Sequence, residues 1–86
     1  MEPSYSAIAN QQLDQVIDSG DIDHYNALVT VCEFILDNPA NAQRDSSAIT
    51  TSVGIRFRLA VPGRAPYKVF WAPGGPTIEA VFPYPT

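Results

Sequence analysis

The N-terminal segment, residues 3–18, carries apolar residues at the spacing of an amphipathic helix. Ser4 or Ser6 is available to cap the start of this helix, and Ser19-Gly20 ends it. The apolar positions form one narrow face, which packs on the rest of the chain. They are Ile8, Leu13, Val16 and Ile17.

A wider apolar stripe predicts a second helix that begins after Asp21, the expected N-cap, and runs through Leu36. The sequence Asp37-Asn38-Pro39 ends it, because the residue before a proline resists the helical conformation. Residues 40–52 are small and polar, and they predict either a short helical turn or a plain connection. The stripe consists of Leu28, Val31, Cys32 and Ile35, widened by Tyr25, Val29 and Phe34.

From residue 53 the apolar period changes to two, which predicts a strand over residues 53–61 with one buried face. Turns rich in Pro and Gly follow at 62–66 and 72–76, so residues 67–71 and 77–82 are predicted to complete an antiparallel meander. The face expected toward the helices contains Val53, Ile55, Phe57, Leu59, Val61, Tyr67, Val69, Trp71, Ile78, Ala80 and Phe82. The opposite face contains Arg56, Arg58, Lys68, Phe70, Glu79 and Val81.

These elements predict a single α+β domain over residues 1–86, with two N-terminal helices packed on a three-stranded antiparallel β-meander. The chain has 86 residues, of which 45% are hydrophobic and 16% are charged, a composition typical of a small globular protein. We find no signal-peptide pattern at its start and no apolar run near the ~18 residues of a membrane span. We therefore expect a cytoplasmic protein.

Charge is distributed unevenly along the chain. The net charge is −4, which argues against a general affinity for nucleic-acid backbones. All nine acidic residues except Glu79 lie in the first 45 positions, whereas four of the five basic residues lie between positions 56 and 68. The predicted sheet is therefore locally basic.

Three of these cations are predicted to share the open face of the sheet. Arg56 and Arg58 are two positions apart on one strand, and Lys68 joins them across the first hairpin. Such a group either holds a phosphate or an acidic peptide, or it keeps the sheet soluble and pairs with Glu79.

Three other side chains bear on function. Phe70 beside the cations either stacks on a base, packs against a partner chain, or is covered by the tail at residues 83–85. His24 stands among carboxylates, where a solvated residue is expected rather than a metal ligand. Cys32 lies in an apolar run and is expected to be a buried hydrophobe rather than a reactive thiol. The sequence shows no metal spacing, phosphate loop or nucleophile–base arrangement, so no cofactor is expected.

The motifs on the predicted elements show a family resemblance. The second helix ends in Asn-Pro, and residues 54–58 read GIRFR, residues 67–71 read YKVFW and residues 78–82 read IEAVF. Over roughly residues 20–84, this order resembles the RelE/ParE toxin superfamily. The resemblance implies a toxin-like component of a type II toxin–antitoxin system, whose surface is blocked by an antitoxin. Its target would be DNA gyrase or mRNA on the ribosome, reached through the exposed sheet face.

The RelE-type activity that this resemblance implies is metal-independent endoribonuclease cleavage. Arg58, with Arg56 or Arg64, would stabilise the phosphate in the transition state. Lys68 would stand where many members have Arg, and Tyr84 would act as the acid–base group.

The chain also departs from the family pattern. The family begins with an edge strand before the first helix, and residues 1–9 carry no strand pattern. The chain is acidic, whereas ribosome-acting members are strongly basic, and Tyr84 lies between two prolines. These points favour an altered, ParE-like or inactive member.

The alternative is a noncatalytic protein-interaction module, whose open face or edge strand receives a peptide. A metabolic enzyme ranks below both, because so small a domain has little room for a deep pocket.

Overall fold

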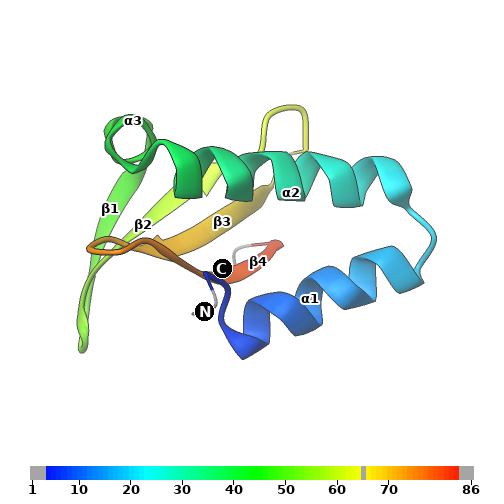
Figure 1. Cartoon of the computed structure of the whole chain (residues 1–86), viewed down its shortest axis with the longest axis horizontal. Helices are drawn as coiled ribbons and strands as arrows, with labels where there is room; N and C mark the ends of the chain where they lie inside the picture. The colour runs from blue at the N-terminus through cyan, green and yellow to red at the C-terminus, as the bar shows by residue number, and fades with distance from the viewer. Residues whose placement is uncertain (1–3, 65, 84–86) are drawn as a thin grey trace.

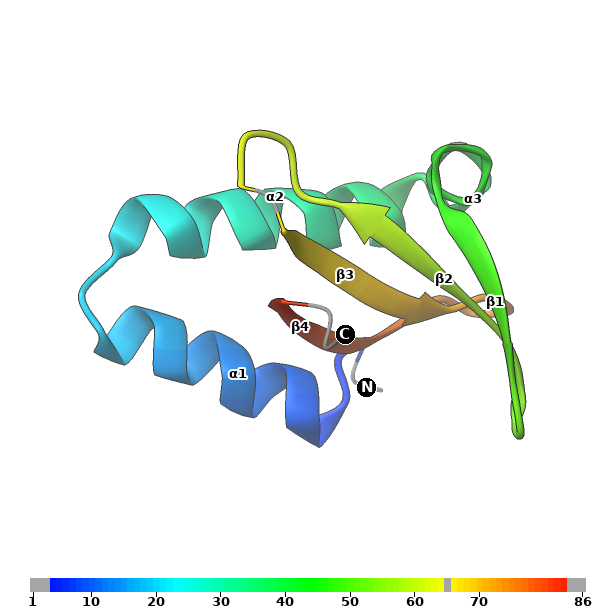
Figure 2. The ribbon, with the colours of Figure 1, turned by 180° about the vertical axis from the view of Figure 1, so that it is seen from behind.

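The computed structural model describes residues 4–64 and 66–83 (Figure 1). Three helices come first and a four-stranded antiparallel sheet follows, in the spatial order β1-β2-β3-β4. Helices α1 and α2 lie on one side of the sheet, and Figure 2 shows the arrangement from behind. The elements are α1 (Ala7–Asp18), α2 (Ile22–Asp37), α3 (Pro39–Asp45), β1 (Ser47–Thr51), β2 (Gly54–Ala60), β3 (Tyr67–Ala72) and β4 (Thr77–Pro83).

Side-chain caps explain where α1 and α2 begin. The Ser6 hydroxyl accepts a hydrogen bond from the backbone N–H of Ala9 at 3.0 Å, and the Asp21 carboxylate accepts one from the N–H of His24 at 3.0 Å. Gly20 turns the chain between the helices with a φ of +85°, a conformation that glycine adopts without strain. The two predicted helices are therefore confirmed, although α1 begins after Ser6 instead of at residue 3.

The residues just before α1 add a contact at the β4 edge of the sheet. Tyr5 forms a parallel bridge with Ile78, in which the N–H of Ser6 donates to the Ile78 carbonyl and the N–H of Ile78 donates to the Ser4 carbonyl, both at 2.8 Å. No strand forms there in the described residues, yet β4 is not a bare edge. A bridge of one residue pair is too short to give an alternating apolar pattern, so the sequence does not predict it.

The sequence predicts two helices and three strands, but the described structure has three helices and four strands. Segment 40–52 supplies most of α3 and all of β1. Pro39 begins α3, because a proline fits the first turn of a helix, where its missing N–H is not needed. β1 then pairs antiparallel with β2 along its whole length. The α+β class, with helices followed by an antiparallel meander, is confirmed.

A β-bulge changes which residues of β4 face the helices. Phe70 pairs with Ala80 and Trp71 pairs with Ile78, so Glu79 is the extra residue between them. Val81, predicted on the open face, is therefore buried, and Ala80, predicted toward the helices, lies opposite Phe70. The corresponding prediction for the Phe82 side chain lies outside the described part of the structure.

The β1–β2 hairpin extends beyond the helices (Figure 1). For this reason Val53 and Ile55, predicted in the core, are 74% and 52% exposed. Phe57 further along β2 is buried and packs on Trp71, with ring centroids 5.0 Å apart.

Among the described helices, none combines the length and the apolarity that crossing a bilayer requires. The core consists of Ala9, Leu13, Leu28, Val31, Cys32, Ile35, Ala42, Phe57, Val61, Val69, Trp71, Ile78 and Val81.

Candidate functional site

The sheet face opposite the helices carries the predicted cations. Arg58 lies directly across from Phe70 in the β2–β3 register, and Phe70 lies across from Ala80 in the β3–β4 register. Because directly paired residues point to the same side, Arg58, Phe70 and Ala80 form one row on this face. Lys68 is two positions from Phe70 on β3 and therefore shares the face. We call the half-buried set Arg56, Arg58, Lys68 and Phe70 the sheet-face cluster.

The charge of this cluster is partly compensated within the chain. Arg56 Nε lies 3.0 Å from Glu79 Oε1, and the two side chains are 20% and 38% exposed. Glu79 is the extra residue of the β4 bulge, and its carboxylate reaches Arg56 on β2. Arg56 is therefore held by an acid of the same domain, as one of the sequence-based alternatives expected.

The other predicted site residues are not brought to the sheet-face cluster. Arg64 lies in the β2–β3 turn and lines a hollow with Asp21, His24 and Tyr67, on the side of the sheet that carries the helices. Tyr84, the expected acid–base group, lies outside the described residues. The described structure therefore does not assemble the full RelE-type set of catalytic side chains.

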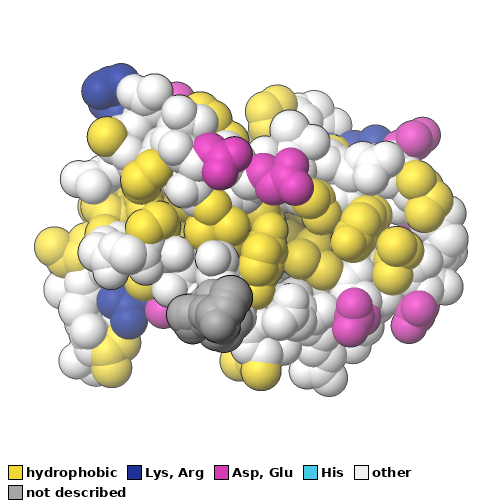
Figure 3. Space-filling model, in the orientation of Figure 1, with side chains coloured by type: hydrophobic (Ala, Val, Ile, Leu, Met, Phe, Trp, Pro, Cys, Tyr) yellow, Lys and Arg dark blue, Asp and Glu magenta, His cyan; other side chains and the backbone are white. Residues whose placement is uncertain are grey.

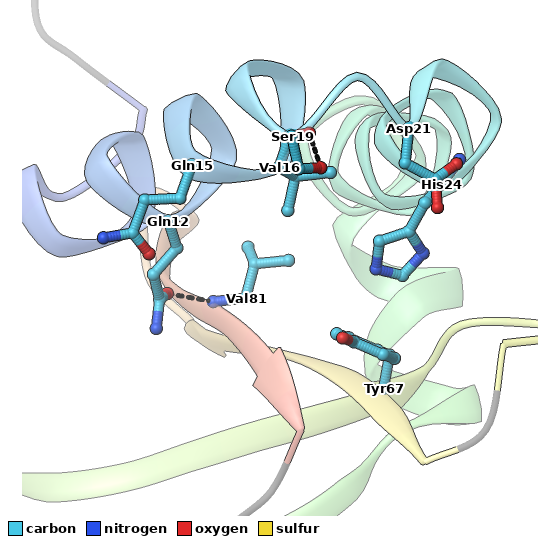
Figure 4. A pocket seen from close by; sticks show the side chains of 8 residues that line it. All are labelled: Gln12, Gln15, Val16, Ser19, Asp21, His24, Tyr67 and Val81. Atoms are coloured by element: carbon cyan, nitrogen blue, oxygen red, sulfur yellow. Dashed lines mark hydrogen bonds between the residues drawn. The ribbon is translucent and has the colours of Figure 1, made fainter.

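A second candidate site, missed at the sequence level, lies between α1, the start of α2 and the ends of β3 and β4 (Figure 4). Its volume is about 360 Å³, and an adjoining hollow of about 340 Å³ continues past Tyr67 to Arg64. We call it the His24 pocket. It is lined by Gln12, Gln15, Val16, Ser19, Asp21, His24, Tyr67 and Val81.

His24 is the unusual residue of this pocket. It is only 8% exposed, and its Nε2 atom has no hydrogen-bond partner among the described residues. Its ring packs edge-on against the ring of Tyr67, with centroids 4.3 Å apart. A buried polar atom left unpaired costs about 1–3 kcal/mol. The expectation that His24 is solvated was wrong, because it continues the spacing of Leu28 and Ile35 on the buried side of α2.

The polar groups around the pocket are mostly engaged in fixing the backbone. Gln12 Oε1 accepts a hydrogen bond from the N–H of Val81 at 2.7 Å, the Ser19 hydroxyl donates to the Val16 carbonyl, and Asp21 caps α2. No group of three or more potential metal ligands occurs in residues 4–64 and 66–83. The pocket is thus a hollow of mixed polar and apolar lining, in which the Nε2 atom of His24 has no hydrogen-bond partner among the described residues.

The pKa values of one buried and one half-buried side chain are raised well above neutral pH, so both groups stay protonated there. Burial, reinforced by the Glu33 carboxylate, raises the pKa of the Cys32 thiol to about 12. Burial is also the main reason that the pKa of Tyr5 is raised to about 12. Cys32 is fully buried, so the expectation of a small buried hydrophobe is confirmed.

Comparison of the chain with protein-family models, with curated proteins and with solved structures finds no match.

Proposed function

We propose that this protein is a toxin-like module of the RelE/ParE kind, which binds a cellular target through the open face of its sheet. The observation that carries this proposal is the row in which Arg58 lies opposite Phe70, with Lys68 beside it. Cations around an aromatic ring suit a partner that offers both negative charge and flat apolar surface. The target would be a gyrase-like protein or mRNA on the ribosome, and an antitoxin would cover this surface.

The architecture supports the proposal at a second point. The resemblance implies an edge strand ahead of the first helix, and the isolated Tyr5–Ile78 bridge is a shorter contact at that place. It joins the sheet beside β4 immediately before α1 begins. One departure from the family pattern is therefore smaller than the sequence suggests.

Binding is favoured over RNA cleavage as the mode of action. Arg56 is paired with Glu79, and Arg64 lines the hollow on the helix side of the sheet. Transition-state stabilisation needs several donors aimed at one developing charge. With Arg56 paired and Arg64 on the helix side, the sheet-face cluster aims fewer donors at one point than the resemblance implies.

The test is bacterial growth after induction of the chain, compared with Arg58→Ala and Lys68→Ala. Arg44→Ala on α3 is the matched control, because it removes an exposed cation away from the sheet-face cluster. Growth arrest that the two face substitutions relieve, and the control does not, would support the proposal. Arrest that neither face substitution changes would rule out this surface. Circular dichroism must show that each variant is folded.

The second candidate function is a noncatalytic protein-interaction module. The Arg56–Glu79 pair favours it over RNA cleavage, because a guanidinium that is neutralised within the domain is less available to stabilise a phosphate. β1 also lies at an edge of the sheet with Ala48 and Thr50 exposed, and an edge strand can receive a peptide by backbone pairing. Normal growth with well-folded protein would favour this second function.

A further inference from the structure

The helix side of the molecule carries an apolar band with acidic margins. Ile22, Tyr25, Val29 and Leu36 lie along one side of α2, with the exposed Glu33 between the last two. Tyr25, Val29 and Leu36 are half-buried and also pack against the core. Ile17 near the end of α1 is 41% exposed, and Ile22 is 50% exposed. Figure 3 shows hydrophobic side chains running across the molecule between the two helices. We call these five residues the helix-side band.

Carboxylates lie on both sides of this band. Asp14 and Asp18 are one turn apart on the exposed side of α1, and Glu33 and Asp37 are one turn apart on the exposed side of α2. In Figure 3, acidic side chains accordingly appear both above and below the hydrophobic row. Residues 1–43 contain no Lys or Arg, so nothing in the helical layer α1–α2 offsets this charge.

The band is chemically distinct from the sheet-face cluster. The sheet side presents Arg58 and Lys68, whereas α1 and α2 present only acids. A partner of the helix side must therefore combine an apolar stripe with flanking positive charge. The opposite charges of the two sides favour different partners.

The shape of the band favours a helix as the occupant. The apolar positions on α2 run from Ile22 to Leu36, which is about 21 Å at 1.5 Å per residue. A helix satisfies its own backbone hydrogen bonds and can lie along two other helices by side-chain packing alone. A β-strand would find no backbone partner there, because the carbonyls and N–H groups of α1 and α2 are used within each helix.

We infer that the helix-side band is a docking surface for a basic amphipathic helix of about 15 residues supplied by a partner protein. Its apolar stripe would run along α2 from Ile22 to Leu36, with Ile17 of α1 beside it. Its Lys or Arg residues on either side would meet the acidic pairs of α1 and α2. This inference does not rest on the proposed function, since it concerns the opposite side of the molecule.

The test uses a designed helical peptide of about 15 residues, with leucines at helical spacing and lysines on both flanks. A second peptide carries glutamate in place of each lysine. Binding to the ¹⁵N-labelled protein is followed by amide chemical shifts, with the Glu33→Lys/Asp37→Lys protein as the test variant. The matched control is Asp23→Lys/Asp45→Lys, which makes the same change in net charge at exposed positions off the band.

Saturable binding of the lysine peptide, with shifts confined to α1 and α2, is the expected result. The test variant should bind at least about tenfold more weakly, while the control variant changes little. Absence of saturable binding, equal binding of the glutamate peptide, or shifts centred on β2 and β3 would overturn the inference. Self-association of the protein alone through the band would also overturn it, because a second copy would then be the occupant. A growth defect lost in Arg58→Ala, with peptide binding intact, would separate this surface from the sheet-face cluster.

Discussion

The indole N–H of Trp71 donates a hydrogen bond of 3.1 Å to the hydroxyl oxygen of Ser46, at the junction of α3 and β1. The same hydroxyl donates to the carbonyl of Ala42 at 2.6 Å. Trp71 is almost fully buried at 1% exposure, so its polar atom needs a partner. A single serine thus ties the last helix to the centre of the sheet.

Replacing Ser46 by alanine is expected to lower the free energy of unfolding by about 1–3 kcal/mol, because the buried indole N–H loses its acceptor. Urea unfolding followed by the fluorescence of Trp71, the chain's only tryptophan, measures the change. Ser47→Ala, one position along at an exposed site, is the control and should change stability by less than about 0.5 kcal/mol. Equal effects of the two substitutions would show that the hydrogen bond contributes nothing.

The segment around this junction is the part of the fold that the sequence does not predict. The periodicity of α1 and α2 and the Asp21 cap are local features that the sequence predicts, and of the two caps expected for α1, Ser4 or Ser6, the structure has Ser6. Segment 40–52 has neither a helical nor a strand period, because its residues are small and polar. Its structure comes from tertiary contacts, such as burial of Ala42 and pairing of β1 with β2, which no local pattern encodes.

The residues of the candidate sites are likewise predictable only where a local pattern places them. The common face of Arg56, Arg58 and Lys68 follows from alternation along strands and was predictable. The Arg56–Glu79 ion pair is one of two alternatives that the sequence predicts for these cations, and the structure contains it. The burial of His24 was readable from its spacing to Leu28, although the neighbouring carboxylates suggested exposure instead.

Alkaline pH is expected to destabilise the protein through Cys32. The unfolded chain releases the thiol proton near its ordinary pKa of 9.0, whereas burial raises the folded-state pKa of Cys32 to about 12. Between these values the unfolded state binds fewer protons than the folded state, so the free energy of unfolding falls as pH rises. The slope reaches at most about 1.4 kcal/mol per pH unit for this one group.

Urea unfolding at a series of pH values above 8.5 tests the prediction, with Cys32→Ala as the comparison. That variant should be less stable overall because of the cavity, but its stability should fall less steeply above the ordinary thiol pKa. Tyr5→Phe should remove a later part of the decline, since burial raises the pKa of Tyr5 from 10.0 to about 12. Identical slopes in all three proteins would contradict the assignment.

The Arg56–Glu79 pair is expected to contribute little to stability. Both side chains are partly exposed, so the ion pair is screened, and Glu79→Gln should cost about 0.2–1 kcal/mol. The cost should decrease at high salt. A double-mutant cycle with Arg56→Gln isolates the pairwise contribution. A coupling energy well above this range, or one that salt does not change, would mean that the pair is a structural element and not part of a solvated binding face.

Replacement of His24 by phenylalanine is expected to leave stability unchanged or to raise it. The substitution keeps an aromatic ring beside Tyr67 and removes the Nε2 atom, which has no hydrogen-bond partner among the described residues. Replacing an unsatisfied buried polar group by an apolar group of similar shape is close to neutral, whereas His24→Ala would also lose the ring contact and leave a cavity.

The two variants are compared by urea unfolding. Tyr67→Phe, which keeps the ring and removes only the hydroxyl, is the control on the partner side. A loss above about 1 kcal/mol in His24→Phe would show that the imidazole has a stabilising partner. A neutral result would mean that folding does not require histidine at this position. A role for the His24 imidazole would then lie in binding a ligand in the His24 pocket.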